Sequence, residues 1–422
     1  MVTHADVMIE LESIDRDLLD GRFGPAAARA MSLLVRYGSA IGATRFISIT
    51  AAHIDGCLYH GPSSVEFAER FAGLGGRVRV PTTLNSAAVD VAHPELNHAP
   101  PGLLAAQRKL IALYKRLGCT ETLTCAPYQR VNRPAFGQHI AWGESNAIVF
   151  ANSVLGARTD RYGDFTDLCA ALTARVPLAG LHCDENRQAT ARFDIVEQGH
   201  SGLPRDLYFA AVGYLIGTAA LGRVPLLVGL PTDATEDELK ALGASAAASG
   251  SVALFHALHI TPEASTMEQA AGKRALECSL HIDAQAIENA IRMLCPLETG
   301  EPLAAMCVGT PHFSRAEFAT LGALVSGRRA APGVEVYVST SREVATEIRA
   351  SGDLERLEEF GGKVVLDTCA YFAPIVRGTD GVIVTNSAKF AHYGPGNLRR
   401  RVGLMTLQRC VRSAELGVVA PP

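Results

Sequence analysis

Two patterns of apolar and polar positions alternate along this chain. Short apolar runs rich in valine, isoleucine and leucine are followed by longer stretches in which apolar residues recur every three or four positions. The first pattern predicts buried strands, and the second predicts amphipathic helices. Their regular alternation is typical of α/β proteins, in which helices connect the strands of a parallel sheet.

The individual segments can be assigned from these patterns. The first half predicts helices at residues 6–19, 25–37, 64–76 and 101–118, and strands at 45–54, 77–85 and 120–125. The second half predicts helices at 206–222, 235–250, 281–295, 314–327 and 341–361, and strands at 223–230, 251–258, 302–309, 334–340, 363–369 and 381–387. Pro25 and Pro101 stand at helix starts, where a missing N–H costs nothing, and Asp283 is a candidate N-cap.

A polar, irregular segment at residues 184–205 indicates a domain boundary. We therefore expect one α/β domain at residues 1–190 and an α/β region at 191–422, with a weaker break at 261–272 that would divide this region into subdomains. The predicted fold class is α/β, with parallel or mixed sheets flanked by helices in two to three domains.

Composition narrows the class of protein. The 422 residues carry a formal charge of -4 and are 48% hydrophobic and 19% charged, which is typical of a well-buried globular protein without a nucleic-acid footprint. No apolar stretch resembles a signal peptide or reaches the length of a membrane span. The ten cysteines form no CxxC pair. These features predict a reduced, cytoplasmic protein.

Three cysteines share a position in this pattern. Cys125, Cys307 and Cys369 each close a predicted strand and are followed within a few residues by a proline. Ligands of open α/β sheets bind beyond the carboxyl ends of strands, so these thiols could meet in one cleft and hold an iron–sulfur cluster, iron or zinc. Packing as small core residues is the alternative for each. Cys57 and Cys183 also follow apolar runs, so position alone does not separate them from the three.

Polar loops also follow the apolar strands. They lie at residues 53–64, 80–85, 309–314 and 384–396, and the stretch 139–164 holds amides and hydroxyls around the only tryptophan. One such loop is explained by local turn hydrogen bonds. Because buried polar groups need partners, several such loops together favour a bound polar substrate.

These stretches resemble the aconitase X family. The resemblance rests on AHIDG from residue 52, VPTTLN from 80, TCAPYQ from 124, HIAWGESNAIVFANSVLGART from 139, GTPHFS from 309, DTC from 367 and TNSAKFAHY from 385. It extends from near residue 11 to near residue 403. It implies an aconitase-like α/β fold and a hydro-lyase whose large part holds the metal centre.

The resemblance also implies site residues. It assigns an iron–sulfur cluster of uncertain nuclearity to Cys125, Cys307 and Cys369. The implied catalytic residues are Lys389, Ser387 and Glu144. The implied substrate-binding residues are Ser64, Thr82, Thr83, Asn85, Ser145, Asn152, Arg158 and His312.

Members of this family dehydrate cis-3-hydroxy-L-proline or mevalonate 5-phosphate. Archaeal-type members tend to have a cysteine where this chain has Thr310. We therefore expect dehydration of cis-3-hydroxy-L-proline to a cyclic imine carboxylate, 1-pyrroline-2-carboxylate. The chain has no glycine-rich nucleotide motif.

The resemblance further implies that the swivelling domain of aconitases is absent and that a small swivel-type subunit is the partner. Two alternative functions remain. One is a mevalonate 5-phosphate dehydratase large subunit, with Arg130, Arg133 and Arg158 as a phosphate clamp. The other, from a different class, is a non-catalytic metal-binding subunit.

Overall fold

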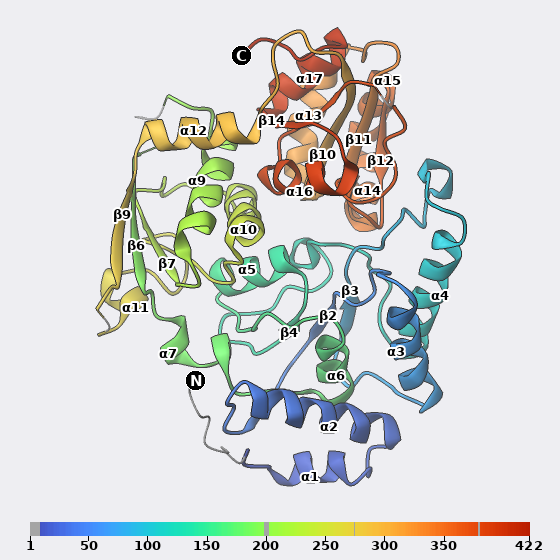
Figure 1. Ribbon diagram of the computed structural model, residues 1–422, viewed down its shortest axis with the longest axis vertical. Helices are drawn as coiled ribbons and strands as arrows, with labels where there is room; N and C mark the ends of the chain where they lie inside the picture. Colours follow the sequence, from blue (N-terminus) through green and yellow to red (C-terminus); the bar gives the residue numbers. More distant parts are fainter. Residues whose placement is uncertain (1–8, 198–201, 274, 379) are drawn as a thin grey trace.

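The structure is a computed structural model that describes residues 9–197, 202–273, 275–378 and 380–422. Its elements fall into three units, each built around its own sheet (Figure 1). The first unit runs from blue to green in the figure, the second from light green to yellow, and the third from orange to red. The three units meet near helices α5 (Ser145–Ser153), α10 (Glu236–Gly250) and α16 (Ala388–Leu398). Helix α10 of the second unit packs against α5 of the first and α16 of the third.

The first unit combines a small parallel sheet with helices around it. Its remaining helices are α1 (Ser13–Leu19), α2 (Pro25–Ala40), α3 (Pro62–Gly73), α4 (Leu103–Arg116), α6 (Thr166–Thr173) and α7 (Asp184–Arg187). Its strands are β1 (Phe46–Ser48), β2 (Ala52–Ile54), β3 (Thr82–Leu84), β4 (Ala141–Trp142) and β5 (Arg175–Pro177). Strands β3, β2 and β4 pair in parallel, whereas β1 and β5 form a separate antiparallel pair.

The second and third units are more regular. The second contains β6 (Ala191–Ile195), α9 (Arg205–Ala220), β7 (Pro225–Val228), β8 (His256–Ala257), α11 (Met267–Ala271), β9 (Cys278–Ile282) and α12 (Ala284–Leu294). The third contains β10 (Leu303–Phe313), α13 (Arg315–Val325), β11 (Glu335–Thr340), α14 (Arg342–Ser351), α15 (Asp353–Phe360), β12 (Gly362–Val365), β13 (Val382–Thr385), β14 (Val402–Leu404) and α17 (Leu407–Leu416).

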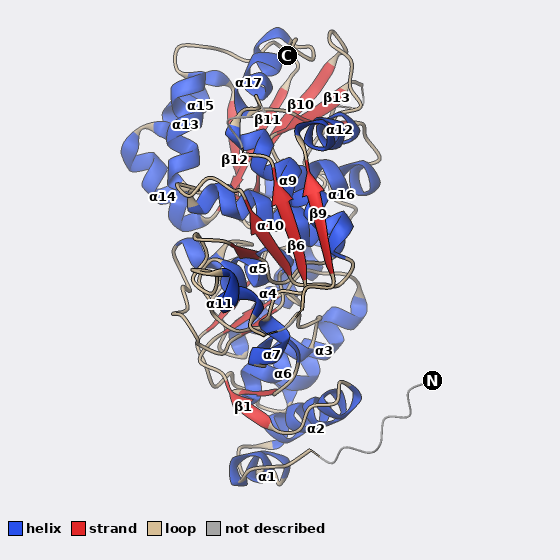
Figure 2. Cartoon of the chain, turned by 90° about the vertical axis from the view of Figure 1, so that its left-hand side faces the viewer, coloured by secondary structure: helices blue, strands red, loops and turns tan. Residues whose placement is uncertain are grey.

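Both of these sheets are parallel, with strand orders β8-β7-β6-β9 and β12-β11-β10-β13-β14. Figure 2 shows helices packed beside both sheets and the first unit at the opposite end of the molecule from α17. The predicted α/β class with parallel or mixed sheets is confirmed. Of the helices described, none has the length and apolarity needed to cross a lipid bilayer.

Local capping explains several helix starts. The Asp283 carboxylate accepts from Ala286 N–H at 2.8 Å and begins α12, as the sequence predicts. Thr235 with Glu238 and Ser314 with Glu317 form capping boxes that begin α10 and α13.

Some predicted segments differ from the structure. Residues 45–54 split into β1 and β2, which belong to different sheets. The predicted strand 120–125 makes only one isolated bridge, between Thr83 and Thr120, and 251–258 contributes only the short β8. The first helix begins at Ser13 instead of residue 6, and residues 6–8 lie outside the described part of the chain.

Candidate functional site

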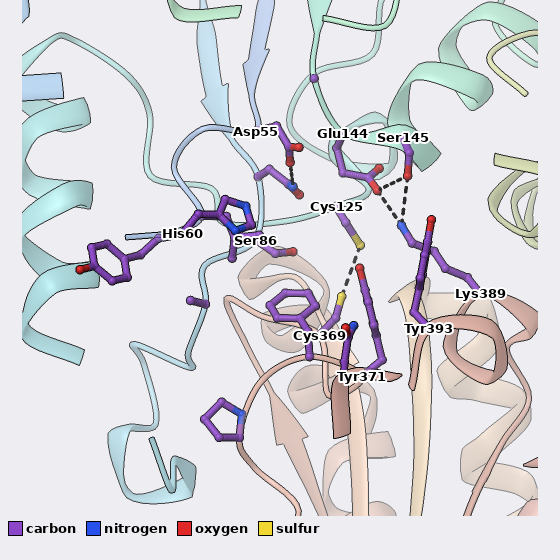
Figure 3. Close-up of a pocket in the computed structure, with 18 of the residues that line it drawn as sticks. Asp55, His60, Ser86, Cys125, Glu144, Ser145, Cys369, Tyr371, Lys389 and Tyr393 are labelled. Carbon is purple, nitrogen blue, oxygen red and sulfur yellow. Dashed lines mark hydrogen bonds and ion pairs between the residues drawn. The ribbon is translucent and has the colours of Figure 1, made fainter. Parts of the chain in front are cut away.

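A cavity of about 700 Å³ lies between the first and third units. We call it the thiol cavity, because Cys125 and Cys369 both line it. Figure 3 shows side chains from loops and helix starts of the two units converging on the sulfur atoms.

The two thiols form a pair. The Sγ atoms of Cys125 and Cys369 lie 3.8 Å apart, and the backbone N–H of His312 donates to Cys125 Sγ at 3.3 Å. Burial opposes ionisation of Cys125, but the hydrogen bond from the Cys369 thiol, together with the neighbouring His312 and Lys389, lowers the pKa of Cys125. The same hydrogen bond raises the pKa of Cys369. The pair therefore favours one thiolate, which is the form that binds metals.

The His312 ring completes a possible donor set. Its Nε2 lies 3.0 Å from the Thr368 carbonyl, and its Nδ1 lies 3.0 Å from the Thr124 hydroxyl. A carbonyl can only accept, so Nε2 carries the proton, and the Nδ1 lone pair accepts from Thr124 here and would bind a metal in place of that hydrogen bond. One donor atom from each of Cys125, His312 and Cys369 lies within 4.8 Å of the others, so these residues could hold a metal ion. Two thiols and an imidazole suit iron or zinc.

Cys307 does not join this group. The prediction that it closes its strand is wrong, because β10 continues past it to Phe313 and pairs with β11 on one side and β13 on the other. Cys307 instead packs in a core cluster with Ala305 and Ile383, where burial raises its pKa. A neutral, enclosed thiol of this kind behaves as a small hydrophobic residue.

An ion pair between the first and third units forms another wall of the thiol cavity. Lys389 Nζ lies 2.7 Å from Glu144 Oε1, and both side chains are more than nine-tenths buried. Glu144 also caps α5 by accepting from Ala147 N–H at 2.6 Å. Lys389 outweighs the effect of burial and lowers the pKa of Glu144, while Glu144 raises the pKa of Lys389. The Ser145 hydroxyl lies 3.2 Å from Glu144 Oε1 and 3.5 Å from Lys389 Nζ.

The opposite wall carries Asn85, which was expected to bind substrate, and also Asp55 and Ser86, which the sequence analysis did not assign to the site. Asp55 lines the cavity, and the Asn85 amide donates to its carboxylate. Burial, followed by the negative charges of Asp164 and Glu144, raises the pKa of Asp55 to about 7. Ser86 lines the cavity beside Asn85. The sequence did offer a signal, because Asp55 stands in AHIDG and Ser86 directly follows VPTTLN.

Asp167 fixes the backbone of this wall by hydrogen bonds. Its carboxylate accepts from the backbone N–H groups of Asp55 at 2.7 Å and Gly56 at 3.4 Å. Burial is the largest influence on Asp167 and raises its pKa to about 8. The loop after β2 is thereby fixed, with the Asp55 side chain at the cavity.

Several residues expected to bind substrate bond within the protein instead of lining the thiol cavity. Ser64 Oγ accepts from His60 N–H at 3.3 Å, and the Thr82 hydroxyl donates to the Val80 carbonyl at 2.8 Å. Thr83 Oγ1 lies 2.8 Å from His53 Nδ1. Ser387 caps α16 by accepting from Phe390 N–H at 3.1 Å, and so fixes the helix turn that carries Lys389.

Asn152 and Arg158 bond to neighbouring protein groups, and Asn152 also connects the first unit to the second. The Asn152 amide donates to the carbonyls of Thr159 and Ala253, each at 2.9 Å, and its oxygen accepts from Arg187 at 3.0 Å. Arg158 pairs with Asp184. The dense polar stretch after residue 139 therefore serves two purposes: Glu144 and Ser145 face the cavity, and Asn152 and Arg158 satisfy neighbouring groups.

A smaller cavity of about 220 Å³ lies beside Arg130, Arg133 and Lys240, and we call it the arginine cavity. Each of these cations contacts a carboxylate. Arg130 lies 2.5 Å from Glu347, Arg133 lies 2.5 Å from Glu236, and Lys240 lies 2.9 Å from Asp237. Arg158 does not line this cavity, so the three arginines of the alternative phosphate clamp do not meet there.

Comparison with protein families gives a match across almost the whole chain. Family models of the first, second and third domains of aconitase X match residues 8–185, 189–292 and 303–415, respectively. The crystal structure of Thermococcus kodakaraensis aconitase X in its holo-form has a TM-score of 0.86 and 31% sequence identity. That match covers 96% of this chain and 100% of the other.

Curated relatives carry two enzyme names. A cis-3-hydroxy-L-proline dehydratase of Pseudomonas aeruginosa is 42% identical over 96% of this chain and 70% of its own length. The protein of the same name from Hypocrea jecorina is 40% identical over 98% of this chain and 70% of its own length. A phosphomevalonate dehydratase large subunit of Methanothermobacter thermautotrophicus is 35% identical over 92% of this chain and 94% of its own length.

Proposed function

Because this chain belongs to the aconitase X family, we propose that it is a hydro-lyase that dehydrates cis-3-hydroxy-L-proline to 1-pyrroline-2-carboxylate. The observation that carries the choice of substrate is the 42% and 40% identity to two dehydratases of that name over nearly the whole chain. The phosphomevalonate enzymes are more distant, and Arg130 and Arg133 already have carboxylate partners away from the thiol cavity.

Dehydration removes the Cα proton and the 3-hydroxyl of the substrate. Loss of the proton moves negative charge toward the substrate carboxylate, which a fixed cation stabilises. We assign this task to Lys389, because Glu144 keeps it ionised in a buried place and Ser145 helps to orient it. Glu144 and Ser145 accept from two of the three N–H groups of Lys389, so the third can donate to a substrate.

Ser387 acts in this proposal as a positioning residue through its cap of α16. The first organic product is an enamine, and its tautomerisation gives the cyclic imine. Ser145 lines the thiol cavity with its hydroxyl 3.2 Å from Glu144 Oε1, so it is the first residue to test as the group that takes the Cα proton.

The proposed cofactor is an iron–sulfur centre held by Cys125 and Cys369, with His312 as a third donor. Its support is the chemistry of the donor set, two thiols and an imidazole within 4.8 Å of one another. Such a centre would supply Lewis acidity for loss of the hydroxyl. Cys307, assigned as a ligand from the family resemblance, lies in the core and is left out of the proposed set.

The metal assignment is tested by anaerobic purification with iron and sulfide analysis. We expect Cys125→Ser and Cys369→Ser to lose iron and the visible absorption. Cys307→Ser is the matched control, because the same substitution in the core should lower stability and keep the iron. Full iron in Cys369→Ser, or loss of iron in a folded Cys307→Ser protein, would contradict this assignment.

We also propose that a small swivel-type subunit completes the enzyme. Support comes from the archaeal relatives, which are named large subunits, one of which this chain matches over 94% of its length. Free thiols at all ten cysteines support a reducing compartment, and we propose the cytoplasm.

The deciding assay adds cis-3-hydroxy-L-proline or mevalonate 5-phosphate to the chain with and without the small subunit. We expect turnover of hydroxyproline, and only in the mixture. Faster turnover of the phosphorylated compound would replace the proposed substrate. An iron-loaded protein inactive with both compounds, even in the mixture, would indicate a non-catalytic metal-binding subunit.

A further inference from the structure

The wall of the thiol cavity opposite Lys389 carries the Asp55 carboxylate and the side chains of Asn85 and Ser86. Asp55 lines this wall, and no lysine, arginine or histidine nitrogen of the described residues lies within 4.0 Å of its carboxylate. Of the nearby carboxylates, Glu144 is already paired with Lys389. Asp55 therefore forms no ion pair within the described residues.

Two further polar atoms on this wall have no partner. The Asn85 side chain is 5% exposed and the Ser86 side chain 3% exposed, and both line the cavity. Within the described residues, Asn85 Oδ1 and Ser86 Oγ make no hydrogen bond. Since Asn85 Nδ2 donates to Asp55, its free oxygen needs a donor from elsewhere. Buried acceptors without donors are costly, which indicates that a ligand supplies the missing hydrogens.

We propose that Asp55, with the Asn85 side-chain oxygen beside it, binds the secondary ammonium group of a cyclic amino acid substrate. This inference rests on the proposed function and adds to it the recognition of the ring nitrogen. A protonated ring nitrogen has two N–H donors and a positive charge, so it can satisfy both acceptors and neutralise the carboxylate.

The geometry of the cavity fits a ligand with charges of opposite sign at two ends. In Figure 3 the two sulfur atoms lie between Asp55 and Ser86 on one side and Lys389 on the other. In a cyclic α-amino acid the ring nitrogen and the carboxylate share one carbon, so a carboxylate held by Lys389 leaves the ring nitrogen free to face Asp55. Burial, followed by the negative charges of Asp164 and Glu144, raises the pKa of Asp55 to about 7, and a cation bound beside the carboxylate would offset both effects.

The mixture of the chain with the small subunit can be tested with two ligands that differ in one ring atom. L-Proline has a ring ammonium, and (S)-tetrahydrofuran-2-carboxylate has an ether oxygen in its place. We expect the wild-type protein to bind L-proline about 10- to 100-fold more tightly, the worth of one charge-assisted hydrogen bond. The Asp55→Asn variant should lose this preference and bind the ether as the wild type does.

Steady-state kinetics separates this inference from the proposed function. If the wild type dehydrates cis-3-hydroxy-L-proline and Asp55→Asn mainly raises KM, with loss of the preference for the ring nitrogen, the inference is supported. If Asp55→Asn keeps that preference, the inference is overturned while the proposed function stands. If hydroxyproline is not turned over at all, the proposed function fails, and equal wild-type affinity for the two ring compounds would overturn the inference as well.

Ser86→Ala is the matched control on the same wall. It removes an acceptor that carries no charge, so we expect a smaller loss of the preference for L-proline than in Asp55→Asn. The ligand pair gives a result for the wild type alone, and so the inference stays testable even if Asp55→Asn fails to fold. Equal binding of the two ring compounds by the wild type would then decide against it.

Discussion

The thiol cavity and the arginine cavity both contain many charged side chains, but they differ in how those charges are neutralised. In the arginine cavity, Arg130, Arg133 and Lys240 each contact a carboxylate. In the thiol cavity, Asp55 lacks a cation and Ser86 Oγ lacks any partner within the described residues. The difference teaches that charges around a cavity are weak evidence for a ligand where each has a counter-charge, and stronger evidence where one of them has none.

The largest expected effect comes from breaking the buried ion pair of the thiol cavity. Lys389→Ala leaves the Glu144 carboxylate buried without a counter-charge, which should lower the free energy of unfolding by about 3–5 kcal/mol. It should also lower kcat by about 100-fold or more if Lys389 stabilises the developing charge. Chemical denaturation and steady-state assays measure the two effects.

The double variant Glu144→Gln with Lys389→Met separates these two effects. It removes both charges, so most of the lost stability should return while turnover stays low. Normal turnover in a folded Lys389→Ala protein would remove Lys389 from the mechanism.

Asn152→Ala sharpens the distinction between satisfied and unsatisfied polar groups. All the Asn152 contacts described above are to protein groups, so its loss leaves the Thr159 and Ala253 carbonyls without a donor. We expect unfolding to become easier by about 2–3 kcal/mol, with KM unchanged for the folded protein. A raised KM at unchanged stability would instead return Asn152 to the substrate-binding set.

Asp55→Asn should change how stability depends on pH. The pKa of Asp55 is about 7 in the folded chain and near 3.8 in the unfolded chain, so the folded protein holds an extra proton between these values. Wild-type stability therefore falls as the pH rises from about 4 to 7, and the variant should not show this loss. We expect the variant to be more stable than the wild type by up to about 2 kcal/mol above pH 7, a figure reduced for solvent in the cavity. Denaturation at pH 5 and pH 8 measures the difference in unfolding free energy between the variant and the wild type. An equal difference at both pH values would contradict this prediction.

The smallest effects are expected in the arginine cavity. The ion pairs of Arg130 with Glu347 and of Arg133 with Glu236 are largely solvent-exposed, with arginine side chains 42% and 46% accessible. Arg130→Gln and Arg133→Gln should each change stability by less than about 1 kcal/mol. Neither should alter KM for hydroxyproline. An increase in KM of the double variant would show that this cavity takes part in substrate binding.

Local sequence signals predicted much of the fold. The α12 cap at Asp283 depends on residues three apart, and sequence periodicity captures such short-range bonds. The end of β10 was not predictable in this way, because it depends on pairing with β11 and β13. The polar residues Thr310 and His312 were expected in a loop, but they lie within that strand and place Cys307 in its middle.

The site was predictable as a set of residue types and less so as an arrangement. Glu144 and Lys389 were both expected at the site, yet their direct pairing across 245 positions depends on how the first and third units pack together. Asp55 was not assigned to the site, because its importance depends on its burial and its charged neighbours, which are known only from the folded structure.

The separation of Cys125 and Cys369 by 244 positions also has a consequence for synthesis of the chain. A ribosome adds roughly 5–20 residues per second, so Cys125 and Glu144 leave it well before Cys369 and Lys389 exist. For roughly 10 to 50 seconds the nascent first unit carries one of the two thiols and an unpaired acid. The proposed metal centre would find both thiols only after translation has passed residue 369.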